Sequence, residues 1–451
     1  LRCLVGSEMC IRDSIKGTII LTLTGFATRF MGFFYRIFLS HTFGEEGVGI
    51  YQLIFPIYAM GFSLTSAGIE LALSRSTAYY IAKNEKHKAA ELLLTALLIT
   101  EALSIIAMLL IQRYAGFLAV SALHEPRCEK LLMILSYVFP FSALHSSICG
   151  YYLGMKKTKI PSVSQLIEQI TRIGSVWLLY TISCAQGHPF GIAVAVSGLI
   201  AGEICSSLYC LNLLSHEDEL TFTPRAFTSA FKKHAGSLTG LSLPLTGSRV
   251  MLNILQSIEA VSIPIKLQLY GMSVKASLST YGVLTGMALP CILFPSAITN
   301  SVSTMLLPTV AEIQAMDERS QLSSLIRKVF FSCISLGSIC CAGLLLFGQW
   351  IGEFLFHSPS AGDFIVTLAW MCPFLYTNNT LLSILNGIGK TNLSFFINAI
   401  SLVIRIAGVL LFIPKIGING YLWGLLISQL SIFFFCLFYL HYYLQSSNLR
   451  R

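Results

Sequence analysis

Long stretches of apolar side chains recur along the whole chain, and short polar segments separate them. The stretches run for about 20 residues or more, which is the length that an α-helix needs to cross the hydrocarbon core of a bilayer. When the pattern is divided at charged residues and at Gly/Pro clusters, it predicts twelve transmembrane helices. Their approximate limits are 17–40, 50–72, 90–112, 131–153, 160–183, 190–214, 238–262, 278–305, 329–348, 363–386, 393–414 and 417–443.

The longest polar stretch between predicted helices lies around residues 216–233 and divides the twelve helices into two groups of six. We therefore predict an N-lobe at residues 15–214, a cytoplasmic linker at 215–237 and a C-lobe at 238–451. Residues 1–14 (LRCLVGSEMCIRDS) contain no apolar region typical of a signal peptide and resemble translated sequencing-adapter sequence. They are predicted to be a non-native or disordered tail.

The two halves share a short pattern. Lys157-Thr158 precedes Arg172-Ile173, and Lys390-Thr391 precedes Arg405-Ile406, with an offset of 233 residues between the two copies. Because six helices per half is an even number, both halves insert in the same direction and form parallel repeats. The predicted fold class is an all-α polytopic membrane protein with about 12 transmembrane helices in two parallel six-helix lobes. A coincidental likeness between two short loops is the alternative.

Composition agrees with a membrane protein. Hydrophobic residues make up 55% of the chain and charged residues 11%, with a mean hydropathy of +0.73. Soluble domains carry about 25% charged residues. Nine of the 13 cysteines fall inside apolar stretches, where they act as small hydrophobic residues. No CxxC pair or Cys/His cluster has the spacing of a metal site, so we expect neither a metal nor a cofactor.

Lysine and arginine are distributed unequally between the two sets of loops. The loops that share a side with the termini hold 17 of them, and the opposite loops hold 6. By the positive-inside rule, both termini lie in the cytoplasm and the protein is an inner-membrane protein. This asymmetry and the anionic inner leaflet account for the net charge of +9, so nucleic acid is not an expected partner.

Arginines inside the predicted helices are the strongest candidates for a binding site. A charge at the bilayer centre costs about 2.5–3.5 kcal/mol on insertion scales, so such residues seldom face lipid. Arg29 and Arg36 lie seven residues apart on one face of the first helix, and Arg249 begins a polar stripe on the seventh. The planar guanidinium of arginine binds phosphate through two hydrogen bonds. The residues predicted to bind an anionic headgroup are Arg29, Arg249, Arg36, Arg172, Arg405, Asn253 and Gln256.

Acidic residues inside the helices are candidates for coupling to an ion, and we assign this role to Glu70, Glu101 and Glu203. Structural alternatives remain open for several of the charges. Glu168 and Arg172 stand four residues apart in the order that favours an ion pair. Arg36 and Glu259 lie near the ends of their helices and are also placed to extend to the membrane interface.

Three segments resemble the stage V sporulation protein B branch of the polysaccharide flippases, which shares a superfamily with lipid II flippases and with multidrug and toxin extrusion transporters. They are GFATRFMGFFYRIFLSHTFGEEGVGIYQLIFPIY at 25–58, ALSR at 72–75 and GYYLGMKKTKIPSVSQLIEQITRI at 150–173. The resemblance implies two six-helix lobes with alternating access to a cationic central cavity. By this resemblance, Arg29 matches the first of two arginines that line the cavity of the lipid II flippases. Their second arginine aligns with Tyr35, and Arg36 comes one residue later. Glu70 stands where this branch usually has proline.

The leading interpretation is a transporter that flips a polyprenyl-diphosphate-linked sugar across the cytoplasmic membrane, with membrane lipids around it and coupling to H⁺ or Na⁺. The alternative is a cation-coupled multidrug antiporter of the same superfamily. The first predicted helix has two arginines and no carboxylate, which argues against the antiporter. An enzyme is not expected, because outside the tail the chain has only three aspartates, which are not clustered: Asp218, Asp317 and Asp363.

Overall fold

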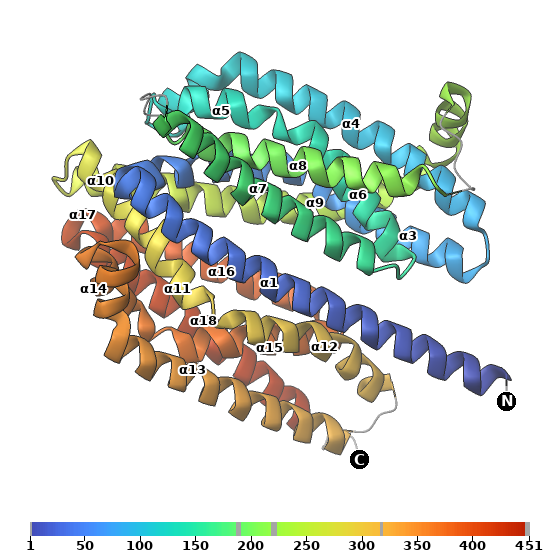
Figure 1. Ribbon diagram of the computed structural model, residues 1–451. Helices are drawn as coiled ribbons and strands as arrows, with labels where there is room; N and C mark the ends of the chain where they lie inside the picture. The colour runs from blue at the N-terminus through green and yellow to red at the C-terminus, as the bar shows by residue number, and fades with distance from the viewer. Residues whose placement is uncertain (1, 186–190, 218–222, 316–318, 447–451) are drawn as a thin grey trace. The chain divides into compact units, whose positions relative to one another are not determined.

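The computed structural model describes residues 2–185, 191–217, 223–315 and 319–446, with the side chains of residues 1–19 and of a few later positions left aside. Nearly all of the described residues are helical, and none of them forms a β-strand (Figure 1). The all-α fold class predicted from the sequence is therefore confirmed. The described helices form two compact units.

Unit 1 comprises residues 1–32 and 53–257. Its elements are the first part of α1 (Arg2–Leu53), α2 (Phe55–Phe62), the π-helix η1 (Ser63–Ala67), α3 (Gly68–Ala82), α4 (Lys86–Phe117), the π-helix η2 (Leu118–Ala122), α5 (Cys128–Ser136), α6 (Val138–Gly154), α7 (Lys159–Ala185), α8 (Ala193–Leu214) and most of α9 (Pro224–Leu269).

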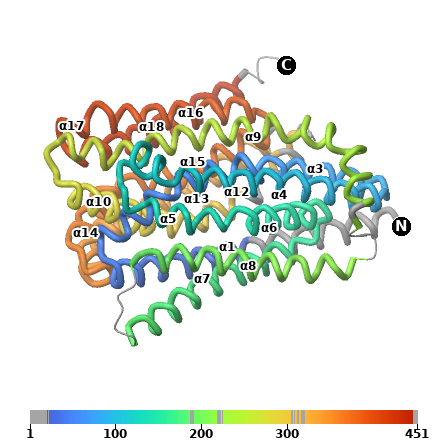
Figure 2. The backbone as a smooth tube through the Cα atoms, turned by 90° about the horizontal axis from the view of Figure 1, so that it is seen from above, coloured from blue at the N-terminus to red at the C-terminus, as the bar shows by residue number. Residues whose placement is uncertain are grey.

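Helix α6 is the central element of unit 1. It packs against α3, α4 and α8, and α7 lies alongside α8, as both views show (Figures 1 and 2). Its residues are buried on nearly all sides from Ser142 to Tyr152, as expected of a helix that other helices surround. Leucines and alanines of α4, including Leu92 and Leu93, form the apolar core with Tyr152. Polar side chains on α6 are therefore held in the interior of the unit.

Unit 2 comprises residues 33–52 and 258–451. Its further elements are α10 (Val274–Gly282), the π-helix η3 (Val283–Ala288), α11 (Leu289–Leu293), α12 (Ser296–Ala315), α13 (Arg319–Phe356), α14 (Pro359–Ala369), α15 (Cys372–Gly387), α16 (Thr391–Ala407), the π-helix η4 (Gly408–Phe412), α17 (Ile413–Ile416) and α18 (Ile418–Ser446). Helix α15 packs against α12, α13 and α18. Its buried Tyr376 hydroxyl donates to the carbonyl oxygen of Ile292 at 2.7 Å.

The backbone repeats with the offset of 233 residues that the sequence shows. His124 and His357 both have positive φ, at 55° and 51°, and each follows the end of a long helix. Lys156 and Gly389 form a second such pair, with φ of 61° and 82°. Each lies two residues beyond the end of the preceding helix, α6 or α15. Because residues other than glycine seldom adopt positive φ, the match of His124 with His357 favours the repeat over coincidence.

The number of membrane spans is not confirmed. Among the described residues, eight helices are long and apolar enough to cross a membrane, or nine if the bent pair α5 and α6 is one span. The run from Thr22 to Ala82 counts as a single helix by this measure, although the sequence predicted two spans in it. The count of twelve therefore stays a prediction.

Two predicted boundaries differ from the described structure. Helix α9 begins at Pro224 and continues through the segment predicted as a linker, because proline is tolerated in the first turn of a helix and no further proline follows within that segment. Helix α1 begins at Arg2, within the predicted tail, and is kinked at Gly44. Residues 33–52 belong to the same unit as the second half of the chain, and α9 up to Ser257 belongs to the same unit as the first half.

Candidate functional site

A pocket of about 350 Å³ in unit 1 brings together three residues that the sequence predicted for headgroup binding. Arg249, Asn253 and Gln256 line it from α9. Their spacing of four and three residues places them on one face of that helix. The other lining residues come from α2, η1 and α9, and they are Tyr58, Ala59, Phe62, Ser63, Ala67 and Leu252.

Asn253 fixes α9 against the opposite wall of this pocket. Its amide donates to the carbonyl oxygen of Ala59 at 3.2 Å and also to the hydroxyl of Ser63. Ser63 begins the π-helix η1, a rare geometry that is frequent at functional sites. At the next residue after η1, Gly68 allows a close approach, since a Cβ there would lie 1.9 Å from Thr246 Oγ1. The pocket wall is thus built by close contact and by partly buried hydrogen bonds.

Arg249 supplies positive charge to the pocket. Its side chain is exposed, and among the described residues its guanidinium forms no ion pair or hydrogen bond. The half-buried Glu70 of α3 is near enough to interact with it electrostatically. A guanidinium that keeps its donors free is suited to an external anion.

The other two arginines predicted for the cavity have different surroundings. Arg29 lies on α1 in unit 1, and its side chain is exposed without an ion pair or hydrogen bond among the described residues. Arg36 belongs to unit 2, where its Nη1 donates to the carbonyl oxygen of Thr285 in η3 at 3.1 Å. A π-helix disturbs the regular backbone ladder, and Arg36 satisfies one of its carbonyl groups.

Arg172 and Arg405, at equivalent positions of the repeat, are both held by carboxylates. Arg172 pairs with Glu168 on its own helix, as the four-residue spacing predicted. The Nε of Arg405 donates to the buried Glu259 at 2.7 Å. The two arginines therefore have internal partners in this structure, and their role in headgroup binding stays a prediction.

The three carboxylates predicted for ion coupling lie in separate places in unit 1. Glu203 is buried on α8, and its Oε2 lies 3.1 Å from Nδ1 of His145 on α6. Glu70 on α3 interacts electrostatically with Arg249. Glu101 on α4 is half-buried, and within the described part of the chain its Oε1 has no hydrogen-bond partner. They do not form one carboxylate cluster.

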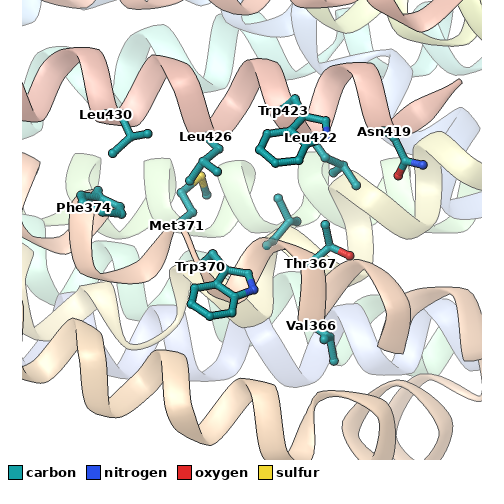
Figure 3. Close-up of a pocket in the computed structure, with 11 residues that line it drawn as sticks. Val366, Thr367, Trp370, Met371, Phe374, Asn419, Leu422, Trp423, Leu426 and Leu430 are labelled. Carbon is teal, nitrogen blue, oxygen red and sulfur yellow. The ribbon is translucent and has the colours of Figure 1, made fainter. Parts of the chain in front are cut away.

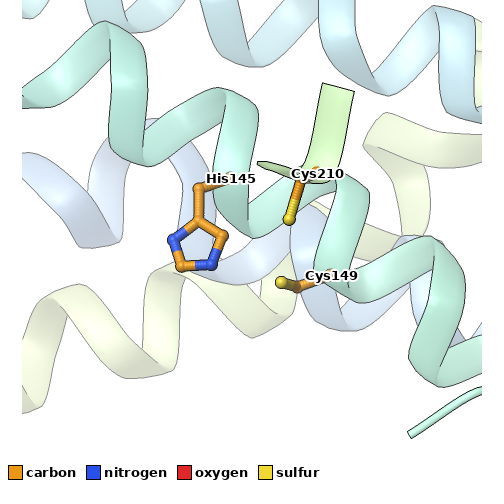
Figure 4. A group of neighbouring side chains, drawn as sticks. All are labelled: His145, Cys149 and Cys210. Carbon is orange, nitrogen blue, oxygen red and sulfur yellow. The ribbon is translucent and has the colours of Figure 1, made fainter. Parts of the chain in front are cut away.

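The structure contains a buried cluster that the sequence did not predict, formed by His145, Cys149 and Cys210 (Figure 4). His145 and Cys149 stand four residues apart on one face of α6, a signal that the sequence does contain. Cys210 comes from α8 and was treated as a small hydrophobic residue, because its approach to α6 depends on tertiary packing.

A second pocket, of about 540 Å³, lies in unit 2 between residues 366–374 and 419–430 (Figure 3). Its lining is largely apolar, and Thr367 and Asn419 are its polar members. Trp370 and Trp423 are each 60% exposed, which is typical of aromatic side chains that face a membrane. The lining offers no charge for a phosphate group, so this pocket is a weaker candidate for the headgroup site.

Comparison with known proteins identifies the family of the chain and proteins of similar fold. Residues 14–314 match the family of polysaccharide biosynthesis proteins. Stage V sporulation protein B of Bacillus subtilis (strain 168) is 28% identical over 417 residues, which cover 91% of this chain and 80% of that relative. The fold is similar to that of an inward-facing multidrug resistance MATE family transporter of the MOP superfamily, with a TM-score of 0.72 and 14% identity over 95% of this chain and 98% of that one.

The lipid II flippase MurJ, in an inward closed conformation, is a further structural neighbour. Its TM-score is 0.71, with 18% identity over 94% of this chain and 87% of that chain. The chain therefore belongs to the polysaccharide biosynthesis protein family and is a multi-pass membrane protein, with a fold similar to those of a MATE family transporter and a lipid II flippase.

Proposed function

We propose that this protein flips a polyprenyl-diphosphate-linked sugar across the cytoplasmic membrane by alternating access, with both termini in the cytoplasm. The observation that carries the proposal is the pocket on α9, where the exposed Arg249 lies beside Asn253 and Gln256. This lining offers a cation and two amide groups to a diphosphate and its first sugar. The polyprenyl chain would stay in the bilayer.

The names of similar proteins support the class of substrate. MurJ is a lipid II flippase, and the matched family acts in polysaccharide biosynthesis. The chemistry of the pocket agrees, because arginine retains its charge when partly desolvated and presents a fork of donors to phosphate oxygens. Transport rather than catalysis is proposed, and the coupling to H⁺ or Na⁺ belongs to the same proposal.

The test is a flipping assay with the full chain, preceded by a start Met and reconstituted in liposomes with a labelled polyprenyl-diphosphate sugar. Loss of a hydrogen bond to a charged group is worth about 1.5–3 kcal/mol, so Arg249→Ala should slow flipping by about 10–100-fold. The flipping rate of Arg249→Lys should lie between those of wild type and Arg249→Ala, because lysine keeps the positive charge but loses the planar set of donors of the guanidinium. Imposed pH or sodium gradients in the same liposomes identify the coupling ion.

The matched control is Arg113→Ala, which removes another exposed arginine of unit 1, on α4. It should leave flipping unchanged. Equal flipping by wild type and Arg249→Ala would contradict the proposed site. Efflux of a cationic dye without any lipid flipping would instead favour the multidrug antiporter.

A further inference from the structure

Buried polar side chains from three helices of unit 1 lie next to one another. Helix α6 contributes His145 and Cys149, which are 8% and 7% exposed. Helix α8 contributes Glu203 and Cys210, which are separated by seven residues and so share a face. Helix α7 contributes the buried Ser164. The arrangement lies outside the Arg249 pocket, since none of these residues lines it.

His145 is held in a defined orientation at this point. Its Nδ1 lies 3.1 Å from Glu203 Oε2, and its Nε2 lies 3.0 Å from the hydroxyl oxygen of Ser164. The same hydroxyl oxygen is 3.4 Å from the sulfur of Cys149. The carboxylate therefore contacts one nitrogen of the ring, and the other nitrogen contacts the hydroxyl of Ser164, which also lies beside the Cys149 thiol. Histidines that bind metals are commonly oriented by a carboxylate in this way.

The distances between the donor atoms suit one metal ion. The ligand atoms of His145, Cys149 and Cys210 all lie within 4.8 Å of one another. In a tetrahedral zinc site with bonds of about 2.0–2.3 Å, the donors are about 3.5–3.8 Å apart. Side-chain rotations that close the triangle by about 1 Å are sufficient. Ser164 or a water molecule is available for the fourth position.

We propose that His145, Cys149 and Cys210 form a structural Zn²⁺ site that fastens α6 to α8 inside unit 1. Two thiolates and an imidazole select a soft or borderline ion over Na⁺, Mg²⁺ or Ca²⁺, which prefer oxygen ligands. The charges also balance. With a neutral imidazole, which zinc coordination requires, two thiol protons leave when Zn²⁺ enters and the net charge of the buried site does not change. Monovalent copper would leave an extra negative charge there.

This site is independent of the proposed flipping activity, because it concerns the integrity of unit 1 and not the substrate. An ion that binds the folded state raises thermal stability in proportion to the logarithm of its concentration above Kd. The described Cys149 and Cys210 are free thiols, as coordination requires. Glu203 acts as a positioning residue through its contact with the imidazole.

The experiment measures the metal content of the full chain, purified in detergent with a phosphine reductant. We expect about one Zn²⁺ per chain by mass spectrometry. Replacement of zinc by Co²⁺ should give thiolate-to-cobalt charge-transfer absorption. Cys149→Ser and Cys210→Ser should each abolish both signals, and Cys436→Ser, which removes a fully buried thiol in the apolar core of unit 2, should change neither.

Glu203→Gln separates positioning from simple destabilisation. It should still bind zinc at saturation but with about 10–100-fold lower affinity, the usual effect of losing such a partner. If the cysteine variants do not fold, wild type alone is informative, because a chelator should lower its melting temperature and added Zn²⁺ should restore it. Wild-type protein without zinc or cobalt binding, copper in place of zinc, or equal zinc in the cysteine variants would overturn the proposal.

Discussion

Arg405, which is partly buried, and the buried Glu259 form a charge pair whose partners come from different helices of unit 2. Arg405 lies on α16, Glu259 on α9, and the hydroxyl of Tyr421 on α18 also donates to Glu259 at 2.7 Å. The sequence identified both charges as unusual for a membrane span. It could not pair them, because 146 residues separate them and only the packing of three helices brings them together.

Removing one member of this pair should destabilise the protein. Glu259→Ala leaves the partly buried guanidinium of Arg405 without its partner, and the loss should be smaller than the ~3–5 kcal/mol of a fully buried pair. Arg405→Met combined with Glu259→Met should recover much of the loss, since apolar side chains of similar volume replace both charges. Thermal unfolding in detergent measures both variants. A double variant no more stable than Glu259→Ala would show that the residues do not act as a pair.

The ion pair between Glu125 and Arg127 predicts a pH dependence in the loop between η2 and α5. The hydrogen bond from Arg127 Nε to Glu125 Oε1, at 2.6 Å, lowers the pKa of the Glu125 carboxyl below its ordinary value of 4.5. The stabilisation is complete above the ordinary carboxyl range and is lost as the pH falls through the lowered pKa.

Arg127→Met should therefore unfold more easily than wild type near neutral pH, by less than about 1 kcal/mol, because the arginine is half exposed and screened by solvent. The difference should shrink as the pH falls toward about 3. Melting temperatures across this range provide the measurement. A difference that stays constant with pH would mean that packing, and not the carboxylate, accounts for the effect.

At the scale of elements, the sequence predicted helices well and their ends poorly. The apolar pattern identified the core of α9 at 238–262, but the helix runs from Pro224 to Leu269. Charged residues such as Lys232 and Lys233 signal the edge of the membrane, not the end of a helix. The side chains of Lys233 and His234 in fact hold this part of α9 through Glu91 of α4, at 2.6 and 3.0 Å.

Contact between α1 and α10 in unit 2 depends on glycine. A Cβ on Gly282 would lie 2.2 Å from the carbonyl oxygen of Glu45 and 2.5 Å from the nitrogen of Gly49. Because both obstacles are backbone atoms, no rotamer change relieves them. Gly282→Ala should lower the stability by about 1–3 kcal/mol, the usual range for overpacking.

Gly343→Ala is the matched control in the same unit. Gly343 lies in α13, and a Cβ there would meet nothing within 4 Å. Alanine has the higher helix propensity, so this variant should be neutral or stabilised by up to about 1 kcal/mol. Thermal melting of the two purified variants compares them directly. Equal melting temperatures would show that α1 and α10 do not need this close approach.

At the scale of the whole molecule, the repeat was visible in the sequence as one pair of Lys-Thr turns, and the backbone adds the paired positive-φ residues His124 and His357. The lining of the candidate pocket on α9 was predicted in part. The stripe of Arg249, Asn253 and Gln256 follows from helical periodicity alone, whereas its opposite wall at Ser63 requires tertiary packing. The cluster around His145 was missed for the same reason.

The charge asymmetry makes a prediction about the whole chain, which carries 17 Lys and Arg residues on one set of loops and 6 on the other. Each positive residue near an anionic membrane surface contributes about 1 kcal/mol to its retention there. The turn at Gly389, which precedes Lys390, should therefore be cytoplasmic, and the turn at Gly271 should face the outside.

Reporter insertions at these two turns test the orientation. Both glycines have positive φ and lie between helices, so an insertion there disturbs no helix interior. Green fluorescent protein should fluoresce at Gly389 and alkaline phosphatase should be active at Gly271, because each reporter works on one side of the membrane. The reverse pattern would place the termini outside. Activity of the same reporter at both turns would mean that the number of spans between them is even, contrary to the three predicted by the hydropathy pattern.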